Sequence, residues 1–257
     1  MTSAPLLQVE QVSKRFGGLQ ALSDVELKIY PNQIVGLIGP NGAGKTSLFN
    51  VITGLYQAET GRFSLSGKSY SPSAPHRVAQ AGIARTFQNI RLFADMTACE
   101  NVMVGRHVRT HQGVLGAILR HPAARKEEAA IAQRALELLD FVGIAHLADR
   151  AARHLSYGDQ RRLEIARALA TDPVLLALDE PAAGMNHSEK ENLHQLLLKI
   201  KKQYCAILLI EHDVKLMMSI CDRITVLDYG KIIAEGEPHD IQKNPAVLAA
   251  YLGGEVA

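Results

Sequence analysis

The chain has 257 residues, enough for one large α/β domain or for a main domain with a subdomain. Its 28 basic and 26 acidic residues leave a formal net charge of +2, which argues against a dedicated nucleic-acid-binding protein. No apolar stretch approaches the roughly 18 residues that span a bilayer, and the N-terminus lacks the pattern of a signal peptide. We therefore expect a soluble chain that reaches a membrane only through partner proteins.

Two antiparallel strands are predicted at the start of the chain. Residues 6–13 and 24–30 alternate apolar and polar side chains, and a turn at Gly17 and Gly18 separates them. Phe16 lies in this first connection. An aromatic side chain there can stack on a nucleotide base or can simply pack on the core, and the pattern leaves both open.

A phosphate-binding loop follows the next strand candidate, residues 34–38. Glycines allow backbone N–H groups to point at phosphates, and the helix that starts at residue 46 adds its positive end. We expect Lys45 to neutralise the β- and γ-phosphates and the Thr46 hydroxyl to ligate Mg²⁺. The predicted nucleotide-binding residues are Gly39, Pro40, Asn41, Gly42, Ala43, Gly44, Lys45 and Thr46, which match G-x-x-x-x-G-K-[ST], together with Ser47. Kinases, GTPases, motors and transport ATPases share such a loop.

A polar residue, Gln88, ends the next strand candidate. Residues 61–67 predict a strand, 72–81 a short helix and 83–87 a strand that ends in this glutamine. A glutamine near a phosphate loop can ligate Mg²⁺ or orient water, or it can be an ordinary surface residue.

The pattern becomes helical from residue 96 to 167, which indicates a helical subdomain inserted into an α/β chain. Residues 132, 135, 136 and 139 are apolar and form one stripe on a helix over 125–140. His107 and His111 are four residues apart but lack a third ligand, which favours a solvated loop over a metal site. Ser156 is a good N-cap for a helix that runs to about residue 170, and Gly158 leaves N–H groups accessible at its start. That helix start can bind a second anion or can be a simple cap.

Carboxylates end a continuous apolar strand, residues 174–178. Asp179 is suited to hold Mg²⁺, and Glu180 can take a proton from an attacking water. A helix over 187–202 leads to a second apolar strand, 205–210, after which His212 can reach a γ-phosphate. A hairpin over 224–234 and two short helices over 238–252 complete the chain.

In this order and spacing, these segments closely resemble the ATP-binding subunit of ABC transporters over nearly the whole chain. The resemblance implies an α/β P-loop nucleotide-binding domain with a mixed sheet, an N-terminal antiparallel β-subdomain and an inserted α-helical subdomain. It implies one ATPase domain over 1–257, with core parts at 1–95 and 168–236, a helical part at 96–167 and a helical tail at 237–257.

The resemblance also implies a role for each matching residue. Phe16 stacks on adenine, Glu180 is the catalytic base, His212 contacts the γ-phosphate, and Gln88 binds Mg²⁺ and water. ATP and Mg²⁺ are the expected cofactors, with Thr46, Gln88 and Asp179 at the metal. The segment Ser156, Tyr157, Gly158 and Asp159 is similar to the signature that binds the nucleotide held by an opposite subunit, although Tyr157 replaces a glycine and Asp159 a glutamine.

Within that family, the chain most closely resembles the branched-chain amino acid importers, and among their subunits the larger ATPase subunit. It rests on residues 85–93, 105–122, 163–167, 180–184, 210–213 and 244–253. The implied partners are an identical or related second ATPase, two transmembrane permeases and, indirectly, a periplasmic or extracellular solute-binding protein, without nucleic acid. The implied location is peripheral, on the cytoplasmic face of the inner (plasma) membrane. The alternatives are a lipopolysaccharide or other lipid-export ATPase, a soluble ABC-type ATPase that acts on DNA or ribosomes, and a nucleotide kinase.

Overall fold

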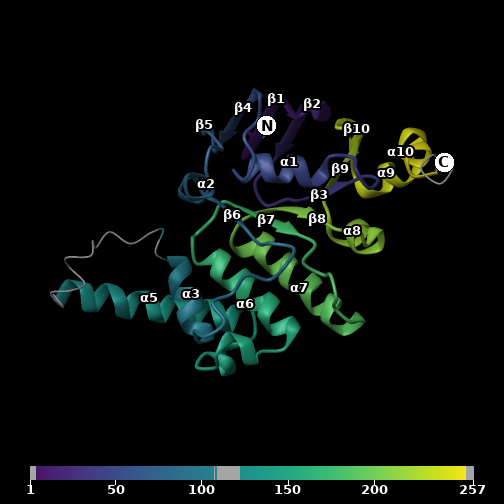
Figure 1. Cartoon of the computed structure of the whole chain (residues 1–257). Helices are drawn as coiled ribbons and strands as arrows, with labels where there is room; N and C mark the ends of the chain where they lie inside the picture. Colours follow the sequence, from purple (N-terminus) through teal and green to yellow (C-terminus); the bar gives the residue numbers. More distant parts are fainter. Residues whose placement is uncertain (1–3, 107, 109–121, 253–257) are drawn as a thin grey trace.

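Two β-sheets enclose the helix that follows the phosphate-binding loop, α1 (Lys45–Ile52). The computed structural model describes residues 4–106, 108 and 122–252 (Figure 1). The antiparallel sheet has the strand order β2 (Leu19–Ile29), β1 (Leu7–Phe16), β4 (Thr60–Leu65), β5 (Lys68–Ser69). The mixed sheet has the order β10 (Lys231–Gly236), β9 (Arg223–Asp228), β3 (Ile34–Ile38), β8 (Ala206–Ile210), β7 (Leu175–Asp179), β6 (Ile83–Arg85).

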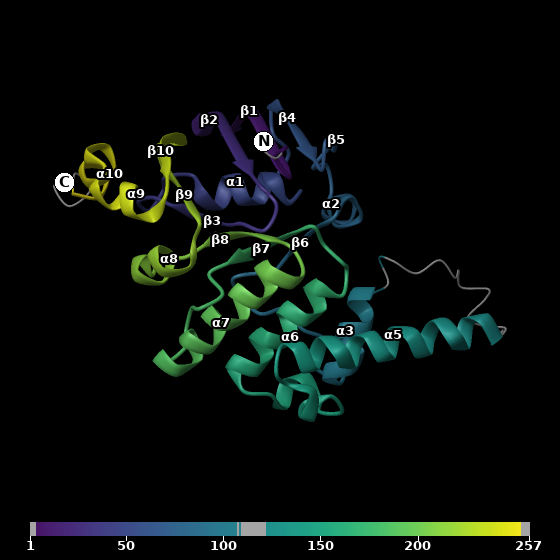
Figure 2. The same ribbon diagram turned by 180° about the vertical axis from the view of Figure 1, so that it is seen from behind.

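Most of the helices cover the other face of the mixed sheet, away from the antiparallel sheet, as both ribbon views show (Figures 1 and 2). α9 (Pro238–Lys243) and α10 (Pro245–Leu252) instead lie beyond the edge strand β10. The other helices are α2 (Pro75–Ala81), α3 (Ala98–Arg106), α5 (Pro122–Phe141), α6 (Tyr157–Leu169), α7 (His187–Gln203) and α8 (Val214–Ile220). Two short 3₁₀ turns, Ala145–Leu147 and Ala152–His154, separate α5 from α6.

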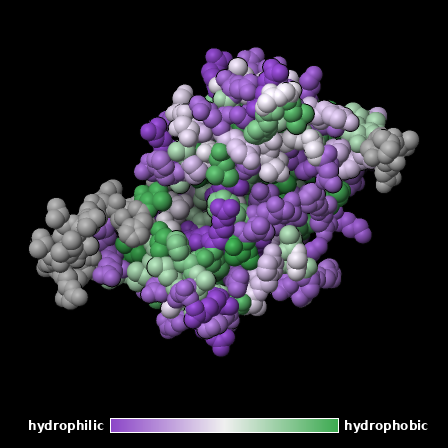
Figure 3. Space-filling model, viewed as in Figure 1, coloured by the Kyte–Doolittle hydropathy of each residue, from purple (hydrophilic) through white to green (hydrophobic). Residues whose placement is uncertain are grey.

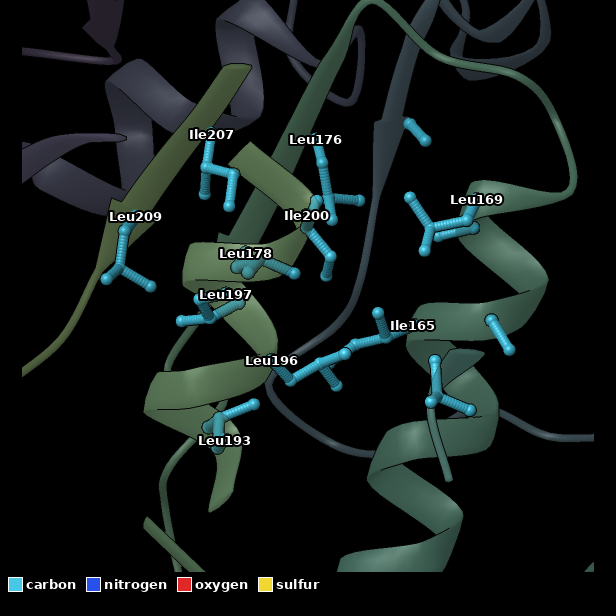
Figure 4. Packing of buried hydrophobic residues seen from close by; sticks show 14 of the residues in the cluster. Ile165, Leu169, Leu176, Leu178, Leu193, Leu196, Leu197, Ile200, Ile207 and Leu209 are labelled. Carbon is cyan, nitrogen blue, oxygen red and sulfur yellow. The ribbon is translucent and has the colours of Figure 1, made fainter. Parts of the chain in front are cut away.

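Apolar side chains from α6 and α7 meet the strands β7 and β8 in one core (Figure 4). Leu193, Leu196, Leu197 and Ile200 recur every three or four residues on α7, and all four are buried. Burial of this stripe, at about 25 cal/mol per Å² of apolar surface, is what stabilises α7 on the sheet. A second core fills the space between the two sheets and includes Leu48, Phe49, Val51 and Ile52 of α1.

The parallel strands of the mixed sheet direct their carboxyl ends to one edge. β3 pairs in parallel with β8, β8 with β7, and β7 with β6. The segments after these strands therefore lie next to one another, where α/β sheets bind their ligands. These segments are the phosphate-binding loop, His212, Glu180 and Gln88.

The predicted α/β fold, with its mixed sheet, antiparallel sheet and helical insertion, is confirmed. Several strand ends differ from the prediction, for example β2, which begins at Leu19 and not at residue 24. Two of the differences concern predicted site residues. β1 extends to Phe16, which therefore ends the strand instead of lying in the connection. β6 ends at Arg85, so Gln88 lies three residues beyond the strand. His107 and His111 lie outside the described residues. No helix in the described part of the chain combines the length and apolar character that a membrane crossing needs.

The predicted apolar stripe on α5 was wrong at one position. Leu136 is 41% exposed, whereas Leu138 is fully buried together with Ala135 and Leu139. The 3.6-residue period alone allowed either leucine to face inward. The buried face is set by the helices that pack on α5, namely α3 and α6.

This difference gives a matched test of the helical core. Leu138→Ala removes a fully buried side chain and should lower the free energy of unfolding by about 2–5 kcal/mol in urea denaturation. Leu136→Ala makes the same chemical change on the exposed face and should stay within about 0.5 kcal/mol of the parent. Equal effects of the two substitutions would contradict the assigned face of α5.

Candidate nucleotide-binding site

A pocket of about 490 Å³ lies at the carboxyl edge of the mixed sheet. Residues 41–47 of the phosphate-binding loop line it, together with four residues predicted from other segments: Phe16, Gln88, Glu180 and His212. The structure therefore brings together side chains that are far apart in the sequence, from Phe16 to His212, which are 196 residues apart. The predicted loop residues Gly39 and Pro40 form the base of the loop below the pocket and hold Lys45 through their carbonyl groups.

Two glycines of the loop are required by its shape. Gly39 has φ of +149°, and a Cβ there would lie 2.0 Å from the carbonyl oxygen of Leu227. Gly44 has φ of +104°, and its Cβ would lie 2.7 Å from the carbonyl oxygen of Ala21. No side chain fits either position, so the loop approaches its neighbours as only glycine allows.

Lys45 begins α1, and its ammonium group lies inside the loop. Its Nζ donates to the carbonyl oxygens of Gly39 at 2.7 Å and Pro40 at 2.9 Å. Burial lowers the pKa of Lys45, and the nearby charge of Glu180 opposes that shift. A buried cation at a helix N-terminus is a favourable partner for an anionic phosphate chain.

The three residues predicted to be catalytic are in contact. Glu180 accepts a hydrogen bond from Gln88 Nε2 at 2.9 Å on one carboxylate oxygen, and its other oxygen lies 2.7 Å from His212 Nε2. The backbone of Glu180 has a φ of +48°, a conformation that residues other than glycine rarely adopt. Such strain at a strand end commonly marks a functional residue.

Asp179 lies one residue earlier, at the buried end of β7, with 6% of its surface exposed. Burial raises the pKa of this carboxyl group, and Arg85, whose Nη2 lies 3.9 Å away, opposes the shift. Arg85 also donates to Asn50 at 3.0 Å and Thr53 at 2.7 Å, so it ties Asp179 to α1. The hydroxyl of Thr46, the amide of Gln88 and the carboxylate of Asp179 are hard oxygen donors, which fits Mg²⁺.

Ser156 caps α6, as predicted, by accepting a hydrogen bond from the backbone N–H of Asp159 at 3.2 Å. Its hydroxyl also donates to the Asp159 carboxylate at 2.7 Å. The Tyr157 ring lies against Gly184, where a Cβ would be 3.5 Å from the ring, and Gly158 is buried against Glu189 of α7. Among the described residues that line the 490 Å³ pocket, none comes from this segment, so one chain does not bring 156–159 to its own phosphate loop.

Sequence reasoning missed further residues of this region. Leu19, Gln20 and Ala21 of β2 and Tyr229 of the β9–β10 turn also line the pocket. The only signal for Tyr229 was the hairpin turn itself, because its place beside the loop depends on β9 pairing with β3. Arg161, which donates to the backbone at Phe87 and Gln88, was missed as well. Its three-residue spacing from Glu164 on α6 was the available signal.

Comparisons with known proteins match this description. The family profile described as ABC transporter covers residues 22–183, and the profile described as branched-chain amino acid ATP-binding cassette transporter covers residues 231–257. The high-affinity branched-chain amino acid transport ATP-binding proteins BraF of Pseudomonas aeruginosa and LivG of Escherichia coli are each 45% identical over 252 residues, which covers 98% of this chain and 99% of theirs. The lipopolysaccharide export system ATP-binding protein LptB of Haemophilus influenzae is 33% identical, over 96% of this chain and 97% of its own.

The fold is also shared with a solved structure. The ADP conformation of MJ1267, an ATP-binding cassette of an ABC transporter, superposes with a TM-score of 0.84 at 32% identity and covers 98% of this chain and 100% of that one. The C-terminal family profile and the two relatives that are 45% identical agree on one family. The chain belongs to the branched-chain amino acid family of ABC transporter ATP-binding proteins, and is an ATPase that couples ATP hydrolysis to transport.

Proposed function

We propose that this chain hydrolyses ATP to power the uptake of branched-chain amino acids through a membrane importer. The observation that carries the hydrolytic role is the Glu180 carboxylate held between Gln88 and His212 beside the phosphate loop. The cargo follows the relatives named for branched-chain amino acids, which are 45% identical, against 33% for the lipid-export relative.

In this proposal, one nucleotide occupies the 490 Å³ pocket. Phe16 offers its half-exposed ring to adenine, and residues 39–47 surround the phosphates. Thr46, Gln88 and Asp179 hold Mg²⁺, which when bound neutralises negative charge on the phosphates. Glu180 orients the attacking water and accepts its proton, and His212 places a hydrogen-bond donor near the γ-phosphate.

The segment 156–159 serves the nucleotide of a second ATPase subunit, identical or paralogous, arranged head to tail. Support comes from the position of this segment outside the pocket of its own chain and from the N-terminus of α6, which favours an anion. Ser156 supplies a hydroxyl, whereas Gly158, which was expected to leave accessible N–H groups, is buried against the Glu189 carboxylate.

A second groove supports docking to transmembrane permeases. It has a volume of about 380 Å³ and is lined by Phe87, Phe93 and Val108, with Arg85 and Arg167 beside them. Figure 3 shows hydrophobic side chains gathered on this face, between the part of the chain with α2 and the part with α3 and α5. An apolar permease segment that carries a carboxylate fits this lining. The ATPase then lies peripherally on the cytoplasmic face of the membrane, and a solute-binding protein acts from the other side.

Glu180→Gln tests the hydrolytic role. The amide keeps the shape of the side chain but cannot accept the proton, so ATPase turnover should fall by at least about 100-fold while ATP binding is retained. Turnover is measured by phosphate release and binding by titration with labelled ATP. Glu191→Gln, an exposed change on α7, is the control and should have no effect on either. A variant with the parent's turnover would remove Glu180 from this role.

Asp159→Asn tests the second-subunit role of the signature segment. The Asp159 carboxylate binds the Ser156 hydroxyl and places negative charge at the start of α6. Its removal should lower the ATP concentration for half-maximal ATPase activity by about two- to fivefold, as expected for one charge near a helix N-terminus. Asp149→Asn, on the exposed surface, is the matched control. An unchanged value for Asp159→Asn would argue against a phosphate at this helix start.

Affinity purification of the full chain from membranes of its native host tests the transport assignment. We expect two small hydrophobic permeases and a second, shorter ATPase. Phe93→Ala, which truncates an aromatic side chain 49% exposed in the groove, should reduce recovery of the permeases by about fivefold or more. Leu248→Ala changes an equally exposed residue, 48%, on α10 and should not. Lipid-export components, or no membrane protein at all, would overturn the cargo and leave the ATPase chemistry standing.

A further inference from the structure

A buried ion pair on α6 has no part in the chemistry described so far. Arg161 and Glu164 are 0% and 1% exposed, and Arg161 Nη1 lies 2.7 Å from Glu164 Oε2. Arg161 is the largest of the fully buried side chains among the described residues. A charged pair placed this deep has lost its water, so its contacts decide what it does.

Those contacts hold the backbone that carries Gln88. Arg161 Nη1 donates to the carbonyl oxygen of Phe87 at 2.7 Å, and Nη2 donates to that of Gln88 at 2.8 Å. Glu164 Oε1 accepts the backbone N–H of Phe87 at 3.3 Å and of Arg91 at 3.5 Å. The two side chains thus supply the partners that a neighbouring strand would supply, at the point where β6 has ended.

The contacts also explain why β6 is short. Its last backbone contact with β7 is the hydrogen bond from the Thr86 N–H to the carbonyl of Ala177, at 3.0 Å. One residue later the chain turns to the side chains of α6. The position of Gln88 relative to the sheet is therefore set by a helix and not by a strand partner.

The same helix begins at the segment proposed to meet the second subunit. Ser156 caps α6, and the hydroxyl of Tyr157, its first residue, accepts a hydrogen bond from Arg161 Nη2 at 3.3 Å. Arg161 also holds the backbone of Gln88, and the side-chain amide of Gln88 donates to Glu180 at 2.9 Å. The first turns of α6 thus connect the start of the signature segment to the backbone that carries Gln88.

Stability does not account for this arrangement. Within the described residues, Nε of Arg161 has no acceptor, so the guanidinium is not fully satisfied. Replacing a buried ion pair with apolar residues of similar volume is often neutral or stabilising. The pair is therefore better explained by what it positions than by what it stabilises.

We propose that Arg161 and Glu164 are positioning residues that set the Gln88 amide against Glu180 and convey movement of α6 to it. The proposal rests on the role of Gln88 proposed above. Arg161 and Glu164 together form a clamp on the backbone at Gln88. When the start of α6 meets a second subunit's nucleotide, this clamp carries the shift of the helix to Gln88. A subunit whose signature segment is engaged then aligns the glutamine of its own site.

The test is a double-mutant cycle on ATPase turnover. Arg161→Met/Glu164→Leu removes both charges together and leaves no buried ion without a partner. Combined with Gln88→Ala, it gives four proteins: the parent, the paired variant, the single variant and the combination. Each is assayed as the full chain with the membrane subunits that co-purify with it, using MgATP, and its folding is checked by urea denaturation.

We expect the paired variant to lower kcat about tenfold or more, because a small misplacement of a catalytic group has that scale of effect, and to leave KM for ATP within about twofold. In the Gln88→Ala background the same change should alter kcat less than twofold, since the side chain that it positions is gone. Arg162→Met, which removes a charge from the next position of α6, is the control and should leave kcat at the parent value.

Multiplicative losses in the cycle would overturn the proposal, because the pair would then act independently of Gln88. Full turnover in the paired variant would overturn it too. If Gln88→Ala itself keeps full turnover, the role proposed for Gln88 fails instead. Should the paired variant not fold, Arg161→Lys replaces it: a single ammonium cannot span both carbonyls and the carboxylate, so kcat should fall while KM holds.

Discussion

The parallel pairing of β6, β7, β8 and β3 is the constraint on which the rest of the structure depends. It brings the ends of the four strands to one edge, and the phosphate loop, Gln88, Glu180 and His212 follow from it. Each strand end contributes little alone, because a single carboxylate or histidine at a strand end has no defined target. Their assembly depends on burial of the strands on both faces, which ties the site to the two hydrophobic cores.

Glu180 occupies the centre of that edge and shows how the fold supports strain. Its left-handed backbone is held by the hydrogen bond from its N–H to the carbonyl of Ile210 at 2.9 Å, while its side chain is fixed by Gln88 and His212. A conformation that costs about 1–3 kcal/mol persists only where its surroundings define it from several sides. Here two neighbouring strand ends and the segment after β6 do so.

The sequence was sufficient for features with a local physical cause. The glycine-rich loop, the continuous apolar strands and the Ser156 cap are all local patterns, and they appear in the structure where they were expected. Features decided by tertiary packing were not predictable in the same way. Periodicity could not choose between Leu136 and Leu138, and no local pattern places Tyr229 beside the loop or ends β6 before Gln88. The contacts of Arg161 and Glu164 with a segment more than 70 residues away are the clearest case.

The tyrosine in place of glycine in the signature segment has a physical reason within this chain. The ring of Tyr157 packs against Gly184, and its hydroxyl accepts a hydrogen bond from Arg161 Nη2 at 3.3 Å. A glycine at 157 would make neither contact. Tyr157 therefore contributes to the contacts of Arg161, which holds the backbone at Gln88. In the proposed arrangement with a second subunit, Tyr157 would link that subunit to Arg161, and the link would be made of packing and one hydrogen bond.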